Sequence, residues 1–328
     1  MGNFTLTAAM ESWPLKTPFR ISRESYTHSE CLVVTLTQGE HTGRGEAQGV
    51  DYEGETPDSM LAQVDSVRHA MENGMSRTDL QAALPLGGAR NALDCALWDL
   101  EAKQSGKSIW ELLGHKPKPV KTVFTIGLED TPEAMAQKAT DASQFPVLKI
   151  KLSEDRPIEN LAAIRKARPD ARLIVDVNQG WSFVELNDML PRLLEVALDL
   201  LEQPLEKTAD DDLIGFQSPI LLAADESCLD SKDLAHAAAR YDVINIKLDK
   251  TGGLTEALKL AHQAKALGKK LMVGNNVGTS LSMAPAFVIA QYCDFVDLDG
   301  PLLLSKDREH GIRYEGPVVN VFGRELWG

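Results

Sequence analysis

Short apolar runs alternate with longer stretches of mixed polarity from residue 119 onward. Eight runs of four to six residues are bounded by turn residues and are typical of β-strands: Val123–Ile126, Val147–Lys151, Arg172–Asp176, Leu198–Glu202, Ile220–Asp225, Val243–Lys247, Lys270–Gly274 and Phe295–Asp299. The stretches between them are helical in character, and one has a readable start where Thr131 precedes Pro132. This alternation predicts a parallel α/β barrel, because about eight strand-and-helix units close such a sheet.

The first part of the chain has a different order. Three short apolar runs separated by turns fit an antiparallel meander, at Phe4–Met10, Cys31–Thr37 and Gly45–Ala47. Helical spacing follows over Ala89–Gln104, and Gly106 is its plausible stop. Strands followed by helices predict a separate α+β unit, and the segment Gly114–Lys121, with its glycine, prolines and lysines, marks the boundary.

Composition fits a globular protein with a large core. Hydrophobic residues make up 43% and charged residues 25% of the 328 residues. The net charge of -14 disfavours a nucleic-acid or anionic-membrane surface, so a small ligand is the expected partner. No run approaches the roughly 18 apolar residues of a membrane span, and the N-terminus lacks a secretory signal pattern. The four cysteines form no CxxC pair and are too few for a disulfide framework, which predicts reduced thiols and a cytoplasmic location.

Five consecutive predicted strands, the second to the sixth, each end in a charged residue. These residues are Lys151, Asp176, Glu202, Asp225 and Lys247, at steps of 25, 26, 23 and 22 residues. Side chains at the carboxyl ends of barrel strands face a common mouth, so we expect these five to form one site.

The three acids of this set, Asp176, Glu202 and Asp225, lie on neighbouring strands. Hard oxygen ligands of this kind suit Mg²⁺, whereas zinc favours thiolate or imidazole ligands. A single acid at a strand end often caps a helix or pairs with a lysine, but three on consecutive strands would repel one another without a cation. We therefore expect one Mg²⁺ per chain.

The two lysines of the set, Lys151 and Lys247, are about four strands apart in a ring of eight and should face each other across the mouth. Opposed bases predict a reaction in which one removes a proton from a carbon next to a carboxylate and the other returns it on the opposite face. The resulting enediolate would need a cation bound to its oxygens. Lys149 lies on the same strand face as Lys151, where like charge would lower the proton affinity of Lys151, and the metal charge should depress both bases further. A solvated pair of lysines on an edge strand is the structural alternative.

Two further features could bind a substrate. Asp297 and Asp299 share one face of the last strand and could hold an ammonium group, although such a pair before Gly-Pro is also common turn chemistry. Arg20 and Arg23 lie between two predicted strands, where a loop could close over the site and clamp a carboxylate, although a surface arginine is the default interpretation.

Several motifs together are highly specific: WPLKTPF, ARNALDCALWDL, KIK, DVNQGW, EQPL, ADES, NIKLDKTGG and DLDGP. Through them the chain resembles, over nearly its whole length, the muconate lactonizing enzyme subgroup of the enolase superfamily, and within it the dipeptide epimerases. The resemblance implies a modified TIM barrel, (β/α)7β, over residues 119–302. It also implies an N-terminal α+β capping domain over residues 1–118, completed by the C-terminal tail 303–328.

The resemblance assigns roles to individual residues. It makes Lys151 and Lys247 the acid/base catalysts, with Lys149 as the neighbour that tunes Lys151. It makes Asp176, Glu202 and Asp225 the Mg²⁺ ligands, with Asn178 as a partner outside the ligand set. For substrate binding it implies Asp297 and Asp299 at the amino terminus, Arg23 at a glutamate side chain, and Asn275 and Asn276 of VGNNVGTS, where relatives carry other residues.

The implied function is epimerisation at the Cα of the C-terminal residue of a dipeptide, with L-Ala-D/L-Glu epimerase activity in murein peptide metabolism. A lyase or cycloisomerase, such as o-succinylbenzoate synthase or muconate cycloisomerase, could use the same metal and lysines but gives no reason for Asp297 and Asp299. A dipeptide binder without activity, and a Schiff-base aldolase using Lys247, are alternatives from other classes. A homo-oligomer is compatible with the sequence.

Overall fold

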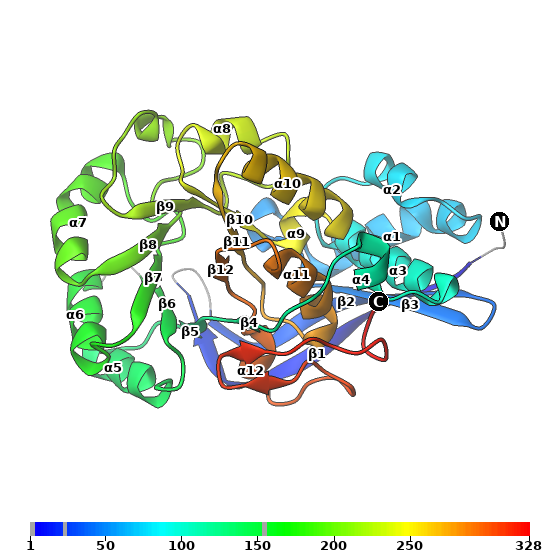
Figure 1. Cartoon of the computed structure of the whole chain (residues 1–328), viewed down its shortest axis with the longest axis horizontal. Helices are drawn as coiled ribbons and strands as arrows, with labels where there is room; N and C mark the ends of the chain where they lie inside the picture. The colour runs from blue at the N-terminus through cyan, green and yellow to red at the C-terminus, as the bar shows by residue number, and fades with distance from the viewer. Residues whose placement is uncertain (1–3, 22–24, 153–155) are drawn as a thin grey trace.

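The computed structural model describes residues 4–21, 25–152 and 156–328. They form a barrel with a smaller domain at its side (Figure 1). Eight parallel strands make one sheet in the order β12-β11-β10-β9-β8-β7-β6-β5. Their bounds are β5 Phe124–Ile126, β6 Val147–Lys151, β7 Arg172–Asp176, β8 Leu198–Glu202, β9 Leu221–Ala224, β10 Val243–Ile246, β11 Lys270–Val273 and β12 Phe295–Val296. All eight predicted barrel strands are confirmed.

The sheet closes between its first and last strands. The backbone N–H of Val123 donates to the Val296 carbonyl at 2.9 Å. Beside it, the N–H of Leu298 donates to Thr122 Oγ1 at 2.9 Å. These bonds join β12 to the start of β5, so the carboxyl ends of all eight strands surround one mouth.

Helices cover the outside of the barrel, as Figure 1 shows for α5, α6 and α7. The bounds are α5 Pro132–Asp141, α6 Pro157–Ala167, α7 Phe183–Glu195, α8 Leu234–Ala238, α9 Leu248–Thr251, α10 Leu254–Ala266, α11 Ser280–Ala290 and α12 Gly300–Leu303, with a 3-10 turn η2 at Asp211–Leu213. The predicted start of α5 is confirmed, because Thr131 Oγ1 accepts the Ala134 N–H. Inside the barrel, buried side chains that include Ile174, Leu200 and Met272 form a separate apolar cluster.

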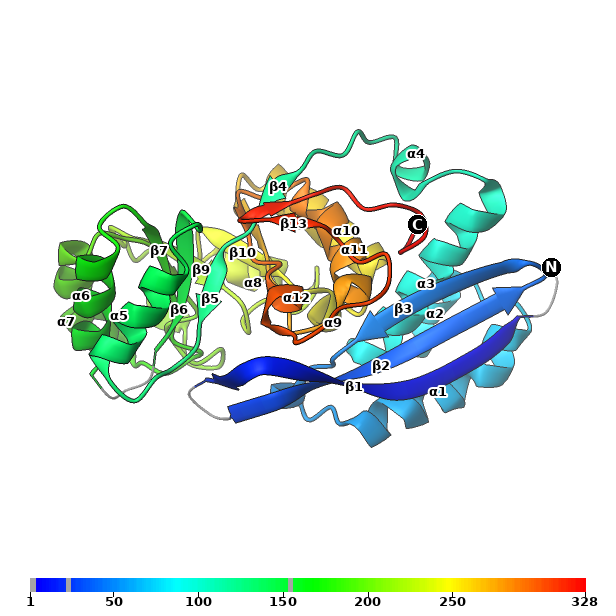
Figure 2. The same ribbon diagram turned by 90° about the horizontal axis from the view of Figure 1, so that it is seen from below.

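The smaller domain is a three-stranded antiparallel sheet packed on helices (Figure 2). Its elements are β1 Thr5–Arg20, β2 Ser25–Gln38, β3 His41–Ala47, the 3-10 turn η1 Asp51–Glu53, α1 Pro57–Glu72, α2 Arg77–Ala83, α3 Gly88–Ser105 and α4 Ile109–Leu113. The predicted helix over Ala89–Gln104 is α3. Strands β1 and β2 are longer than the apolar runs predicted, because their outer halves also pair with each other and include polar, exposed residues such as Ser12 opposite Glu30.

The outer part of this hairpin reaches the barrel. Leu128 N–H donates to the Arg20 carbonyl at 2.9 Å, and Ser305 N–H donates to the Pro14 carbonyl at 2.8 Å. The ammonium of Lys16 donates to the Leu302 carbonyl at 2.9 Å. These bonds place the end of β1 beside the mouth.

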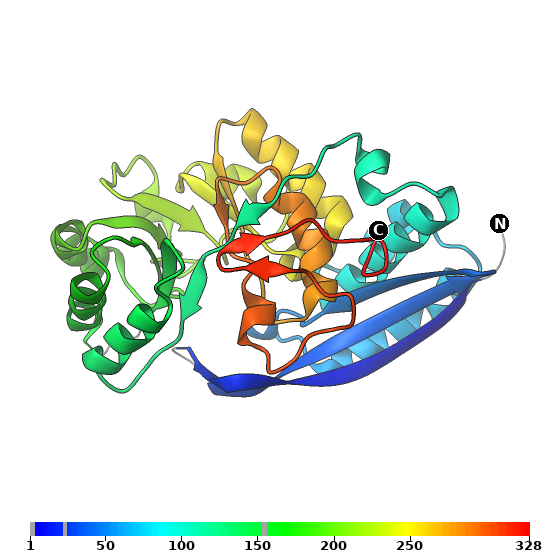
Figure 3. The same cartoon turned by 60° about the horizontal axis from the view of Figure 1, so that its bottom comes forward.

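The C-terminal tail returns to both parts of the molecule (Figure 3). Strands β13 Tyr314–Glu315 and β14 Val318–Val319 form a small sheet with β4 Val120–Lys121. At the end of the chain, Gly328 O accepts the Ile109 N–H at 2.8 Å and Gly328 N–H donates to Asp99 Oδ1 at 2.7 Å. These contacts with α3 and α4 support the tail as part of the smaller domain, and the division at residues 118 and 302 stays a prediction.

The described helices include none that is long and apolar enough to cross a membrane. All four cysteines are free thiols, and Cys31, Cys95 and Cys228 are buried.

Candidate active site

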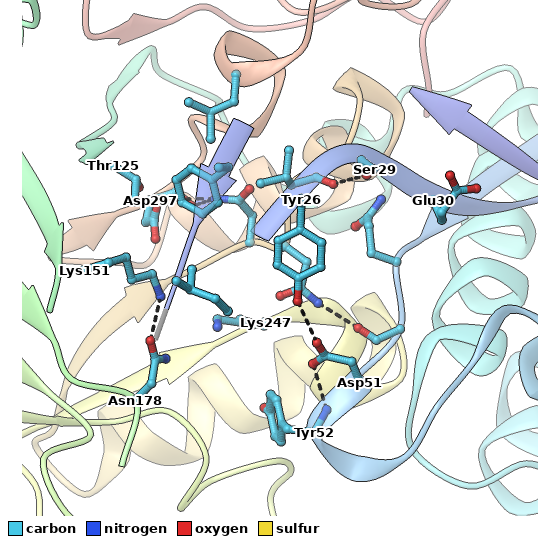
Figure 4. A pocket seen from close by; sticks show the side chains of 18 of the residues that line it. Tyr26, Ser29, Glu30, Asp51, Tyr52, Thr125, Lys151, Asn178, Lys247 and Asp297 are labelled. Atoms are coloured by element: carbon cyan, nitrogen blue, oxygen red, sulfur yellow. Dashed lines mark hydrogen bonds between the residues drawn. The ribbon is translucent and has the colours of Figure 1, made fainter. Parts of the chain in front are cut away.

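A cavity of about 470 Å³ lies at the barrel mouth, within the usual size of a small-ligand pocket. Its barrel side is lined by Thr125, Lys149, Lys151, Asn178, Asp225, Glu226, Lys247, Asn275, Asn276, Val277, Asp297, Asp299 and Leu303. The smaller domain lines the rest with residues from β1, β2 and the segment around η1, among them Phe19, Tyr26 and Tyr52 (Figure 4). We call the smaller domain the capping domain from here on.

Lys151 and Lys247 both reach this cavity from opposite parts of the ring. Lys151 ends β6 and Lys247 directly follows β10, and three strands separate β6 from β10 in either direction around the closed sheet. Each ammonium contacts one of the predicted metal ligands: Lys151 Nζ lies 2.6 Å from Asp176 Oδ2, and Lys247 Nζ lies 2.7 Å from Asp225 Oδ2. Both amines therefore line one cavity of a size that suits a small ligand.

Lys149 lies deeper than Lys151 and is almost fully buried. Its Nζ is 2.8 Å from Glu202 Oε2, 2.9 Å from Asp297 Oδ2 and 3.7 Å from Asp176 Oδ2. Burial alone would lower the pKa of Lys149, but Asp297 and Glu202 outweigh it and raise that pKa well above its usual value. Lys149 therefore carries the positive charge that the predicted tuning of Lys151 requires.

The three predicted metal ligands are buried and closely paired with lysines. Asp225 Oδ1 lies 2.7 Å from Lys250 Nζ, a residue that sequence reasoning missed although it follows Lys247 by one helical turn. Glu202 Oε2 and Asp225 Oδ1 nevertheless accept no directed hydrogen bond. No three His, Cys, Asp or Glu side chains of the described residues stand around one point as a finished metal site. The ligand set stays a prediction, and its buried, incompletely hydrogen-bonded carboxylate oxygens fit a Mg²⁺ ion.

The charges of the acids reflect their neighbours. Burial, with Asp176 as the next cause, raises the pKa of Glu202 to about 7. Burial alone would also raise the pKa of Asp225, but Lys247 and Lys250 outweigh it and hold that pKa far below its usual value. In this structure lysines pair with each of the three carboxyl groups and offset their mutual repulsion.

Asn178 lies between a lysine and an acid. Its Oδ1 accepts from Lys151 Nζ at 3.3 Å, while its backbone N–H donates to Asp176 Oδ1 at 2.9 Å and its Nδ2 donates to Asp176 Oδ2 at 3.2 Å. Asn178 has a positive φ of 45°, which asparagine tolerates better than most residues. These contacts support the predicted role beside the ligands.

Asp297 and Asp299 lie at the cavity after β12. Asn275 Nδ2 donates to the Asp297 carbonyl at 2.7 Å and to Asp297 Oδ1 at 3.3 Å. Asp299 Oδ2 accepts the Thr125 N–H at 2.6 Å. Burial, and then the Asp297 charge, raises the pKa of Asp299 to about 7. Neighbouring residues thus hold both carboxyl groups in place at the cavity. An acidic pair in this position suits an ammonium ligand.

The two remaining substrate-binding predictions have different outcomes. Asn276 lines the cavity, but its Nδ2 donates to the Gly49 carbonyl of the capping domain at 2.7 Å. Arg23 lies outside the described residues. Its neighbour Arg20 is not a cavity-lining residue and contacts Asp130 at 2.5 Å on the surface.

Glu226 and Tyr52 are among the cavity residues that sequence reasoning missed. Glu226 directly follows Asp225, but β9 has ended at Ala224, so the strand alternation that would turn Glu226 away does not apply. Tyr52 comes from the capping domain, where no spacing pattern pointed to the barrel. Glu226 Oε2 and the Tyr52 hydroxyl are buried atoms without a hydrogen-bond partner in the described part of the chain. Burial, followed by Asp225, raises the pKa of Glu226 to about 8.

Comparison with known protein families gives two matches that together span most of the chain. Residues 3–114 match "Mandelate racemase / muconate lactonizing enzyme, N-terminal domain", and residues 133–320 match "Enolase C-terminal domain-like".

Individual relatives cover nearly the full length. The L-Ala-D/L-Glu epimerase of Escherichia coli is 41% identical over 94% of this chain and 97% of its own length. An N-acetyl-D-glutamate racemase from a Pseudoalteromonas species is 44% identical over 77% of this chain and 80% of its own. A solved enolase family member from Agrobacterium tumefaciens, described as homologous to dipeptide epimerases and as binding sodium and L-Ala-L-Glu, superposes with a TM-score of 0.96 at 43% identity, covering 99% of this chain and 100% of its own. Other solved dipeptide epimerases, 26 to 30% identical, are complexes with Mg and a dipeptide.

Proposed function

The chain belongs to the mandelate racemase / muconate lactonizing enzyme family of the enolase superfamily, and we propose that it is a Mg²⁺-dependent epimerase that inverts the Cα of the C-terminal residue of L-Ala-L-Glu. One observation carries the proposal. Lys151 and Lys247 enter the same cavity from opposite parts of the barrel ring, and the acidic pair Asp297 and Asp299 lies at the edge of that cavity.

The two lysines divide the proton transfer between them. One amine removes the proton from Cα on its own side, and the ammonium of the other delivers a proton to the opposite face, which inverts the stereocentre. The roles exchange when the D-epimer is the substrate. A Mg²⁺ ion held by Asp176, Glu202 and Asp225 and bound to the substrate carboxylate would offset the negative charge that develops there when the C–H bond breaks.

The acidic pair fixes which molecule can bind. The amino terminus of a dipeptide lies one residue away from the reacting Cα, and its ammonium would bind Asp297 and Asp299 through charge-assisted hydrogen bonds. Arg23, which lies outside the described residues and between β1 and β2 in the sequence, is the proposed partner of the glutamate side chain. The free thiols support the cytoplasmic location expected from the sequence.

A second candidate is racemisation of an N-acylated amino acid. The similarity to an N-acetyl-D-glutamate racemase favours it, and so does the ion pair that already occupies Asp297 with Lys149 at 2.9 Å. An N-acetyl group has no ammonium, however, so it gives no reason for a second carboxyl group, Asp299, beside the Asp297–Lys149 pair.

Deuterium exchange tests the proposal and separates the candidates. The protein is incubated with Mg²⁺ in deuterated water with L-Ala-L-Glu, L-Ala-D-Glu or N-acetyl-L-glutamate, and deuterium at Cα is followed by NMR. We expect exchange and interconversion of both dipeptides. Exchange of N-acetylglutamate alone would favour the second candidate. No exchange with any substrate, together with calorimetric dipeptide binding, would favour a binder without activity.

A further inference from the structure

The barrel forms hydrogen bonds with the capping-domain backbone on both sides of the Gly49 Cα. Asp249 Oδ1 accepts the backbone N–H of Gln48 at 3.1 Å and that of Gly49 at 3.0 Å. Asn276 Nδ2 donates to the carbonyl of the same Gly49 at 2.7 Å. Asp249 lies in α9, directly after β10, and Asn276 follows β11, so two neighbouring barrel strands supply the two contacts.

Gly49 is closely packed and in a backbone conformation that favours glycine. Gly49 has a φ of +83°, and a Cβ there would lie 2.9 Å from Met60 Sδ. On its other side, a Cβ on Gly88 would lie 2.8 Å from Gly49 Cα. Asp249 is 5% exposed, and its Oδ1 also accepts from Asn91 Nδ2 at 3.3 Å. Gly49 is therefore closely packed within the capping domain, and its hydrogen bonds to Asp249 and Asn276 join it to the barrel.

The segment that follows Gly49 forms one wall of the cavity. Val50 N–H donates to Glu55 Oε2 at 2.8 Å, which closes the loop that contains η1. In this loop, Tyr52 lines the cavity, and Asp51 Oδ2 accepts the Tyr26 hydroxyl at 3.1 Å (Figure 4). The barrel contacts this loop at its start, through Gly49, and again at η1, where Glu53 pairs with Lys207. The hydrogen bonds at Gly49 therefore hold the start of the wall.

The wall faces the part of the substrate that remains after the ammonium and Cα are placed. Figure 4 shows Asp297 and Tyr52 on opposite sides of Lys247. With an ammonium at Asp297 and Cα between the lysines, the side chain of the reacting residue would face the capping domain, whose η1 loop forms part of the cavity lining. Asp249 itself is not a cavity-lining residue, so it can affect the substrate only through this segment.

We propose that Asp249 is a positioning residue: by holding the Gln48–Gly49 backbone it fixes η1 and Tyr52 against the barrel mouth and so sets the wall that selects the substrate's side chain. The inference about selection rests on the proposed function, whereas the holding of the segment does not.

Asp94 provides a matched control. It is also a buried aspartate that joins the capping domain to the barrel, because it accepts Thr255 N–H at 2.9 Å and Thr255 Oγ1 at 2.6 Å. Asp94 lies in α3 and Thr255 in α10, and neither lines the cavity. A purely structural role in joining the domains would make the two aspartates equivalent.

The test uses the full-length protein with Asp249→Ala, Asp249→Asn and Asp94→Ala. Because Oδ1 alone makes all three contacts of Asp249, an asparagine retains the acceptor and should restore wild-type behaviour. Hydrogen exchange measured by mass spectrometry should be faster over residues 48–55 in Asp249→Ala but unchanged there in Asp249→Asn and Asp94→Ala. The KM for L-Ala-L-Glu should rise about tenfold in Asp249→Ala, as for one or two lost hydrogen bonds, with little change in kcat.

The outcomes separate the two claims. Wild-type exchange over residues 48–55 in Asp249→Ala, or an equal rise of KM in Asp94→Ala, would overturn the proposal. If Asp249→Ala does not fold, Asn276→Ala releases the same peptide from its carbonyl side and should give the same local exchange. If the wild-type protein turns over no dipeptide, the proposed function fails, but the exchange data still decide whether Asp249 holds the segment.

Discussion

Lys247 and Asp225, which belong to neighbouring barrel strands, are in direct contact, with 2.7 Å between Nζ and Oδ2. The same carboxylate is a predicted metal ligand, and Lys151 has the same relation to Asp176 at 2.6 Å. A cation at the three acids would compete with both lysines for carboxylate oxygens. The availability of the two amines to a substrate therefore depends on whether a metal ion occupies the three acids.

Removing either amine should stop epimerisation. In Lys151→Ala or Lys247→Ala, one face of the reacting Cα loses its proton donor and acceptor, and a positioned acid/base group typically contributes about 10²- to 10⁴-fold. We expect epimerisation to fall by at least that factor, while deuterium exchange persists from only one epimer in each variant. Polarimetry and NMR in deuterated water measure the two rates.

Lys232→Ala is a suitable control, because the Lys232 side chain is 87% exposed and does not line the cavity. Near-normal epimerisation in either of the two active-site variants would show that a single base, or a different residue, carries the reaction.

Metal binding should stabilise the wild-type protein and not a variant that lacks a ligand. Mg²⁺ at about 100 times its dissociation constant adds about 2.7 kcal/mol to the free energy of unfolding. Thermal unfolding with Mg²⁺ and with EDTA should therefore show a higher Tm with the metal, and the difference should shrink in Glu202→Gln. An equal Mg²⁺-induced shift in Glu202→Gln would remove Glu202 from the ligand set, whatever the activity of the variant.

The barrel and the convergence of its charged strand ends were predictable from the sequence. Five charged residues each close an apolar run, and the parallel register places Lys151 beside Asp176 and Asp176 beside Glu202. Strand ends are a reliable signal because the periodicity of a strand and the closure of the sheet leave little choice about where its last side chain points.

The part of the cavity that the capping domain lines was not predictable in the same way. The outer halves of β1 and β2 mix polar residues and prolines with apolar ones, so the hydrophobic spacing ended β1 too early and started β2 too late. Tyr52 lines the barrel cavity from the capping domain, and Asp249 of the barrel bonds to the capping-domain backbone. No local sequence pattern predicts which residues of two domains contact each other. Glu226 was missed because it lies just past the end of β9, where strand alternation no longer holds.

The stability of the protein should depend on pH through Asp249. Burial raises the pKa of Asp249 to about 7, compared with about 3.9 for an exposed aspartate. Between these values the folded protein binds a proton that the unfolded chain does not, so this group's contribution to the free energy of unfolding falls as the pH rises from about 4 to about 7. Asp249→Asn does not titrate.

Urea unfolding of the wild type and Asp249→Asn at several pH values between about 5 and 8 measures this contribution, because all other titrating groups are common to both proteins. We expect the stability of the wild type relative to the variant to decrease up to about pH 7 and then level off. A constant difference over this range would show that Asp249 has an ordinary pKa in the folded protein.

Close packing between β3 and α3 should make Gly45 intolerant of any side chain. A Cβ on Gly45 would lie 2.0 Å from the Ala92 carbonyl oxygen, a backbone atom that has no freedom to move away. We expect Gly45→Ala to destabilise the protein by about 3 kcal/mol or more, above the usual cost of overpacking. Urea unfolding measures it, and Gly39→Asn, at an open turn with φ +61°, is the tolerated control. Wild-type stability of Gly45→Ala would mean that β3 and α3 lie further apart than described.

Asp299 should distinguish substrates with an ammonium group from those without one. Asp299→Asn keeps the size of the side chain and an acceptor for the Thr125 N–H. Above about pH 7, the pKa of Asp299, it also removes a negative charge from the proposed ammonium site, so the assay is made at a pH above that value. Hydrogen bonds to charged groups contribute about 1.5 to 3 kcal/mol, so kcat/KM for L-Ala-L-Glu should fall about 10- to 100-fold. Any turnover of N-acetyl-L-glutamate, which has no charge at that position, should change by less than about threefold. Asp307→Asn is the control, because Asp307 accepts the Ser280 N–H at 2.9 Å and does not line the cavity. An equal loss on both substrates would assign Asp299 to holding β5 and β12 together, and the reason for preferring a dipeptide would then disappear.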